Sequence, residues 1–375
     1  MYAPPQIGRL YGRLATEVSQ KPNGAASRKR SAKQGRRRKR RFFNKPAGRR
    51  KLLPVFTNQE WRLTMAETTG NNHKKRHLSL QRKNALIAYS FLAPNFIGFI
   101  IITMLPVLFS IVLAFLNWNG GTIDKISWAG LANFQTIFKN FSFAKSDLGI
   151  TLKNTVLYTL ATVPLTIVFA LSFGMLLNKT VRAAKLLRTV FFFPYVASIV
   201  AVCACWNYLL MKYGVVNSFL NSIGFHMTKS WTQSRDLAIW SLIIVAVWRG
   251  AGYYMVLYIA GLQGIPAELY EAATMDGANP WQKFRKITLP MLTPTTFFVS
   301  IMTTIGCFKV FDTVVLMTDG GPGRATKMLV NYIYDLSISQ IKYGVASAVA
   351  MVLFVLVLLV TILQFSAEKR WVNYL

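Results

Sequence analysis

Residues 271–290 read EAATMDGANPWQKFRKITLP, a polar stretch with long apolar runs on both sides. We expect a short helix to begin at Pro266, because proline lacks the amide that a first turn leaves unpaired, and the carboxylate of Glu268 favours the same end. Gly277 is expected to end this helix in a left-handed conformation. One side of the helix would carry the small apolar set Leu269, Ala272 and Ala273.

A second helix is predicted directly after this turn. Asn279 can cap it, with Pro280 at its first position and Gln282 at the spacing of a capping box. Its apolar face would carry Trp281, Phe284 and Ile287, and its basic face Lys283, Arg285 and Lys286. The stretch therefore predicts a helix–turn–helix loop that presents an apolar ridge for docking and a basic side to water or lipid headgroups.

The composition around this loop is that of an integral membrane protein. The chain has 375 residues, 53% of them hydrophobic, with a mean hydropathy of +0.34. Its apolar residues occur in blocks, which excludes an ordinary soluble protein. Cys203, Cys205 and Cys307 lie inside apolar runs and the three histidines form no cluster, so we expect no disulfide and no metal site.

The net charge of +31 is concentrated at the N-terminal side. Of 44 Lys and Arg residues, 23 precede Ala85, where three Glu residues oppose them. Residues 1–64 contain no long apolar run, so we expect them to be disordered unless a polyanion orders them. Three interpretations stay open for this extension: sequence upstream of a start at Met65, a polybasic tether to anionic lipid, or a nucleic-acid-binding arm. Residues 65–84 would form a basic cytoplasmic lead to a transmembrane domain over residues 85–375.

Six apolar runs predict six membrane-spanning helices, and hence an all-α fold. Their cores are near residues 94–116, 156–177, 190–211, 237–262, 297–317 and 345–365. Each has about 20 residues or more, enough to cross roughly 30 Å of hydrocarbon as a helix. Basic residues cluster in two short connections, with Lys179, Arg182, Lys185 and Arg188 in one and Lys283, Arg285 and Lys286 in the other. Those loops and both termini are therefore expected in the cytoplasm.

Residues 264–294 resemble the EAA loop of membrane subunits of ABC importers, the element that couples the membrane part to the ATPase. The family pattern is Glu-Ala-Ala, Gly and Ile-x-Leu-Pro at fixed spacing. It is matched by Glu271, Ala272, Ala273, Gly277, Ile287, Leu289 and Pro290. Asp276, directly before Gly277, is included with them as an expected coupling residue. The resemblance implies a multi-pass protein of a bacterial-type plasma membrane with the type I importer permease architecture. These residues would then contact the ATPase.

The resemblance extends to the carbohydrate-uptake branch, of the maltose or glycerol-phosphate type. It is carried by Trp248, Gly250, the run from Ala260 to Pro266, Phe311-Asp312, the run from Thr318 to Pro322, Thr326, Tyr334 and Trp371. It implies a sugar or related solute, a second, non-identical permease subunit, a cytoplasmic ATP-binding subunit dimer and an extracytoplasmic solute-binding protein. ATP and Mg would be bound by the ATPase, so no cofactor is expected in this chain.

Several residues within the spans are candidates for the solute path. Arg249, Lys309 and Asp312 are costly in a membrane and should face the protein interior or a wet cavity. Lys309 and Asp312 are three residues apart and are expected to neutralise each other on one helix. Arg249 is the better candidate, with a structural role as its alternative. Trp206, Asn207 and Tyr254 offer aromatic faces and an amide donor to a sugar, although aromatic residues in spans are more often packing residues.

The chain has no Gly-x-x-x-x-Gly-Lys-Ser/Thr sequence, so it is not expected to hydrolyse ATP or to be an enzyme. Two other functions are open. An ion-gradient-driven secondary transporter would use Arg249, Lys309 and Asp312 for coupling, but no inverted repeat with broken helices is evident, which counts against it. A membrane-anchored nucleic-acid-binding protein would use the basic extension.

Overall fold

The computed structural model describes residues 72–122, 126–178 and 184–372. The chain divides into two compact units, Met1–Tyr89 and Ser90–Leu375, and the second holds almost all of the described structure. The expectations for residues 1–64, and for Lys179 and Arg182, lie outside the described residues.

The described elements are helices joined by short turns, with one small hairpin. In chain order the first half comprises α3 (Asn72–Phe99), η1 (Ile100–Met104), α4 (Leu105–Leu113), β1 (Leu116–Asn117), β2 (Ser127–Trp128), α5 (Ala132–Phe138), α6 (Asp147–Asn178), α7 (Ala184–Val196), α8 (Ile199–Leu209) and α9 (Val215–Ser222). The second half comprises α10 (Ala238–Gln263), α11 (Ala267–Met275), α12 (Pro280–Lys283), η3 (Phe284–Thr288), α13 (Leu289–Met291), α14 (Thr293–Phe308), α15 (Asp312–Met317), α16 (Leu329–Tyr334), η4 (Asp335–Ser339) and α17 (Tyr343–Trp371). The elements η1, η3 and η4 are single π-helical turns.

Each predicted apolar run is largely helical, and the described residues contain four helices long and apolar enough to cross a membrane. These are Ile87–Leu113, Asp147–Asn178, Ala238–Gln263 and Tyr343–Lys369. Two further pairs satisfy the same test together but are bent, α7 with α8 by 99° and Pro280–Met291 with α14 by 61°. The chain therefore has up to six spans, if each bent pair is one span.

The prediction was wrong about continuity. The third run breaks at Ala197–Ser198, because Ser198 has an extended ψ of 126° and α8 begins after it. The fifth run ends as a helix at Phe308, not at Met317, and a separate helix α15 follows. Broken helices are thus present among the described residues, so only the lack of an evident inverted repeat counts against a secondary transporter.

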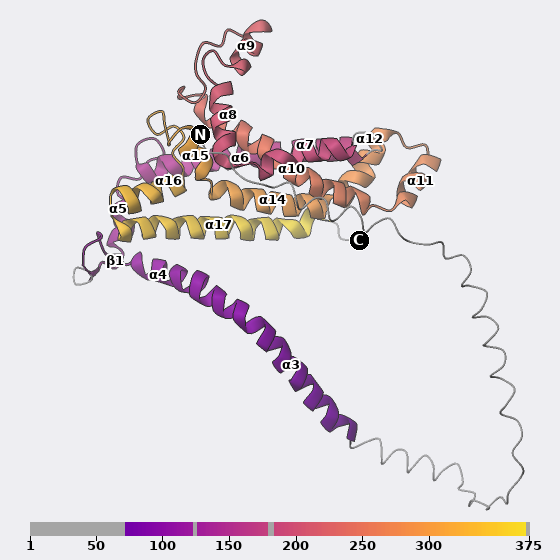
Figure 1. Cartoon of the computed structure of the whole chain (residues 1–375), viewed down its shortest axis with the longest axis horizontal. Coiled ribbons are helices and arrows are strands. Elements are labelled where there is room, and N and C mark those ends of the chain that lie inside the picture. The colour runs from indigo at the N-terminus through magenta and orange to yellow at the C-terminus, as the bar shows by residue number, and fades with distance from the viewer. Residues whose placement is uncertain (1–71, 123–125, 179–183, 373–375) are drawn as a thin grey trace, which may run out of the picture. The chain divides into compact units, whose positions relative to one another are not determined.

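α10 is the central helix of the second unit. It packs against α6, α7 and α14 (Figure 1). Small residues permit the close approach: a Cβ at Gly252 would overlap the backbone carbonyl of Phe191 in α7, and one at Gly174 in α6 would lie 3.0 Å from the Cβ of Tyr258. Because lipid is as apolar as leucine, such close packing, rather than burial from water, holds helices together in a membrane.

The C-terminal helix α17 runs beside α14 and α5 (Figure 1). At its N-terminal end, β1, β2 and α5 form a small cap, in which the Asn133 amide donates to the carbonyls of Ala114 and Leu116 at 2.9 Å each. A second cap is the loop between α15 and α16. Asn154 of α6 donates to the carbonyls of Arg324 and Lys327 at 2.9 and 3.0 Å, so this loop is held against α6.

Candidate functional site

The loop after α10 folds as two short helices. α11 begins at Ala267, one residue later than expected, and Pro266 is its N-cap residue rather than its first helical residue. Gly277 has φ +77°, the left-handed conformation expected of it. Asn279 and Gln282 then form a complete capping box, with both hydrogen bonds at 2.8 Å. The predicted turn chemistry is therefore confirmed.

Two hydrogen bonds join the arms of this loop. The hydroxyls of Tyr270 and Thr288 lie 2.9 Å apart, and Lys283 Nζ donates to Thr274 Oγ1 at 2.8 Å. Ile287 and Tyr270 pack against the buried side chains Leu262, Ile265 and Leu292. The loop therefore has a fixed root in the core, from which its two helices extend.

The tip of the loop exposes apolar side chains. Met275 is 88% exposed and Trp281 65%, while Leu269 is 40% exposed. Of the motif residues, Glu271, Ala272, Asp276, Gly277 and Leu289 are exposed, and Ala273, Ile287 and Pro290 are partly buried. An exposed apolar tip on a rigid root is typical of an interaction surface.

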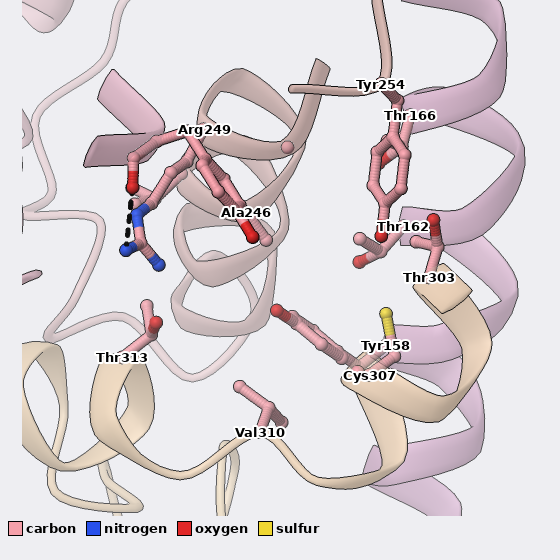
Figure 2. A pocket seen from close by; sticks show the side chains of 14 residues that line it. Tyr158, Thr162, Thr166, Ala246, Arg249, Tyr254, Thr303, Cys307, Val310 and Thr313 are labelled. Carbon is pink, nitrogen blue, oxygen red and sulfur yellow. Dashed lines mark hydrogen bonds between the residues drawn. The ribbon is translucent and has the colours of Figure 1, made fainter. Parts of the chain in front are cut away.

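A cavity of ≈ 220 Å³ lies among α6, α7, α10 and α14 (Figure 2). Its walls are rich in hydroxyl groups and aromatic rings. It is lined by Tyr158, Thr162, Thr166, Tyr195, Val245, Ala246, Arg249, Gly250, Tyr254, Thr303, Gly306, Cys307, Val310 and Thr313. Arg249 and Thr313 lie on one side of it, and Tyr254, Thr162 and Thr303 on the other (Figure 2).

The threonines of α6 change their bonding where the helix meets this cavity. Farther along the helix, Thr151, Thr155 and Thr159 each donate a hydrogen bond of 2.7–2.8 Å to the carbonyl four residues earlier. The buried hydroxyls of Thr162 and Thr166 make no such bond, nor does that of Thr303 across the cavity. Tyr158 and Cys307 lie close to Thr162, and Tyr254 lies close to Thr303, but the threonine hydroxyls make no hydrogen bond of good geometry with them. Buried polar groups are normally paired, so these hydroxyls are available to a bound molecule or water.

Arg249 is held by one residue of α7. Its Nη2 donates to the Tyr195 carbonyl at 3.3 Å, and its guanidinium lies 5.7 Å from the centre of the Tyr195 ring. That ring stacks on Tyr253 at 4.4 Å. The Nε atom of Arg249 is buried without a hydrogen-bond partner. Of the candidates predicted from sequence, Arg249 and Tyr254 thus meet in one cavity.

Trp206 and Asn207 lie elsewhere. Trp206 faces an apolar cavity and packs edge-on against Trp248, with ring centres 5.4 Å apart. The Asn207 amide donates to the Leu316 carbonyl at 3.2 Å, which links α8 to α15. Both contacts are those of packing residues.

The expectation that Lys309 and Asp312 neutralise each other on one helix was wrong. α14 ends at Phe308 and α15 begins at Asp312, so the two residues stand on opposite sides of a break. Both are exposed, and neither lines the cavity. Among the described residues the ion pairs are Arg324–Asp147 and Lys327–Asp335.

Sequence reasoning missed most of the cavity wall, above all Tyr158, Thr162, Thr166, Tyr195, Thr303 and Thr313. One signal was available: Thr151, Thr155, Thr159, Thr162 and Thr166 recur every three or four residues and so share one face of a helix. Which of them meet a cavity depends on the neighbouring helices.

The known proteins that this chain is similar to are membrane permeases of transport systems. Residues 155–373 match the family model described as binding-protein-dependent transport system inner membrane component. A probable ABC transporter permease protein of Bacillus subtilis, YesP, is 36% identical over 78% of this chain and 94% of its own. The lactose transport system permease protein LacF of Rhizobium radiobacter is 32% identical over 78% of this chain and 97% of its own.

A solved structure shares the fold. It is a bacterial ABC transporter involved in the import of the acidic polysaccharide alginate, one chain of which is 25% identical with a TM-score of 0.66. The match covers 79% of this chain and 100% of that chain.

Proposed function

Because the chain belongs to the binding-protein-dependent transport system inner membrane component family, the permeases of ABC importers, we propose that it forms the membrane pathway for a sugar or oligosaccharide. The observation that carries the choice of solute is the cavity beside α10. Hydroxyl oxygens of Thr162, Thr166 and Thr303 lie there without partners, beside tyrosine rings. A sugar ring offers hydroxyls to these threonine oxygens and an apolar face to the tyrosine rings. The similar permease LacF belongs to a lactose transport system.

The exposed loop would couple this pathway to ATP hydrolysis. Trp281 and Met275 present apolar surface, and Glu271 presents a charge beside it. We infer that this tip binds a cytoplasmic ATPase, which holds ATP and Mg. When the ATPase dimer closes, it pushes on α11, and the fixed root at Ile287 and Tyr270 transmits the movement to α10 and α14.

The remaining partners follow from the same arrangement. A second, non-identical permease, which the family resemblance implies, would form the other half of the pathway. The loop 271–290 and both termini would be cytoplasmic, because Lys185, Arg188 and the basic residues of η3 follow the positive-inside rule. An extracytoplasmic binding protein would then deliver solute to the two caps, the one formed by β1, β2 and α5 and the loop between α15 and α16.

Reconstitution tests this function. The chain alone in liposomes should hydrolyse no ATP and take up no sugar. Assembly with a second permease and an ATPase should give ATP-dependent uptake, stimulated by the solute-loaded binding protein. Uptake by the chain alone, driven by an ion gradient without nucleotide, would contradict the proposal and favour a secondary transporter.

A further inference from the structure

The cavity that lines the proposed sugar pathway carries one unbalanced charge. Arg249 is the charged side chain among the described residues that line it, and the lining set contains no Asp, Glu or Lys. Arg249 takes part in neither of the two ion pairs of the described structure. Asp312 precedes the lining residue Thr313, but it is exposed and makes no ion pair with Arg249.

The local contacts of Arg249 do not satisfy it. A guanidinium has five N–H donors in a planar fork. The protein accepts from Nη2 alone, through the Tyr195 carbonyl at 3.3 Å, and Nε is buried and unpaired. A carbonyl and an aromatic face orient the group without neutralising it. Water could satisfy the open donors, but it would leave the charge uncompensated in a membrane span, where charges are costly.

The opposite wall has a different chemistry. Thr162, Thr303 and Tyr254 lie across the cavity from Arg249 (Figure 2), and both threonine hydroxyls are buried and unpaired. A ligand that fits both walls carries an anionic group at one edge and hydroxyls at the other. One guanidinium balances the single charge of a carboxylate and binds it with two parallel N–H···O bonds; it matches the geometry of a phosphate as well, but would neutralise only half of a dianion's charge.

We propose that this permease is selective for acidic sugars, namely oligosaccharides with uronate units, and that Arg249 binds their carboxylate. The proposal rests on the proposed sugar-import function and narrows it. Arg249 would act as the specificity-determining residue, and Thr162, Thr166 and Thr303 would bind hydroxyls that acidic and neutral sugars share.

The test uses the complete importer, reconstituted in liposomes with its ATPase and binding protein. Uptake is measured for trisaccharides of galacturonate, mannuronate or glucuronate, each beside its neutral counterpart, and for a sugar phosphate. The binding protein has its own preferences, so the informative quantity is the ratio of variant to wild-type uptake for each solute. Arg249→Gln is the test variant. Lys309→Gln is the control, because it removes one positive charge outside the cavity.

Wild-type importer should take up a uronate trisaccharide in preference to its neutral counterpart and to the sugar phosphate. Arg249→Gln should lower uronate uptake on the order of tenfold to a hundredfold, as expected for a lost charged hydrogen bond. Uptake of the neutral sugar should change less than about threefold, and Lys309→Gln should change neither. If Arg249→Gln fails to assemble, Arg249→Lys, which keeps the charge but loses the fork, should still lower the preference for uronate.

Three other results would contradict either the preference for uronates or the proposed function. Equal uptake of acidic and neutral sugars, unaffected by either variant of Arg249, would overturn the proposal while leaving sugar import in place. Preference for the sugar phosphate would overturn the carboxylate assignment. Failure to take up any sugar while another solute is imported would instead overturn the proposed function.

Discussion

Glu271 and Gly277 belong to the same exposed loop, but their substitutions should fail in different ways. Glu271→Ala would remove the charged contact proposed with the ATPase, worth about 1.5–3 kcal/mol at a partly buried interface, so sugar should stimulate ATP hydrolysis less. Gly277→Val places a β-branched residue at φ +77°, at a cost of more than about 1 kcal/mol. A Cβ there has no neighbour within 4 Å, so the cost is one of backbone conformation.

We therefore expect Gly277→Val to misplace α11 and to impair uptake more than it lowers the thermal stability of the permease pair. The measurements are solute-stimulated ATPase activity and uptake in the assembled importer, with melting of the isolated pair as control. Near wild-type coupling in both variants would show that this loop is not the coupling element.

At the scale of elements, prolines explain two irregular turns. A proline in a helix has no N–H and its ring collides with the carbonyl four residues earlier. The π-helical turn η3 ends directly before Leu289-Pro290, and η1 ends directly before Leu105-Pro106. In both, the helix widens by one residue ahead of the proline and then continues. The loop motif residue Pro290 thus shapes the connection between the exposed tip and α14.

The contact between α6 and the loop before α16 gives a prediction about stability. Asn154→Ala should leave the carbonyls of Arg324 and Lys327 without their donor, at a cost of about 1–3 kcal/mol. Trypsin should then cleave after Arg324 and Lys327 faster than in the wild-type protein. Asn221→Ala is the matched control, because it also removes an amide with two hydrogen bonds, to Met227, but on an exposed helix. Equal cleavage rates in wild type and Asn154→Ala would contradict this role of Asn154.

At the scale of the whole molecule, the sequence before Met65 is rich in Lys and Arg and contains no long apolar run. Expression from Met65 should leave assembly and uptake unchanged, and both are measured against the full chain. Loss of either would give the extension a role, and the salt dependence of its binding to anionic vesicles and to nucleic acid would then separate the two remaining interpretations.

The features predicted correctly are those set by residues that are close together in the sequence. The six apolar runs, the left-handed Gly277 and the capping box at Asn279 all follow from local chemistry, and the structure confirms them. The break at Ser198 and the end of α14 at Phe308 were missed, because apolar length does not reveal where a helix bends within the bilayer. Arg249 and Tyr254 could be predicted as site residues because a charged or polar aromatic side chain within a span is itself a signal. Thr162 and Thr303 could not, because they line the cavity only through the packing of α6 against α14.

The hydrogen bond from the Asn154 amide to the Arg324 carbonyl also has a consequence for biosynthesis, because it can form only after both residues have been synthesised. Donor and acceptor are 170 residues apart in the chain. At about 5–20 residues per second, a ribosome needs roughly 10–30 s to make the intervening segment. Throughout that interval α6 is inserted with an amide whose permanent acceptors do not yet exist. The Asn154 amide must therefore bond to water at the membrane surface or to the insertion machinery until residues 324–327 have been synthesised.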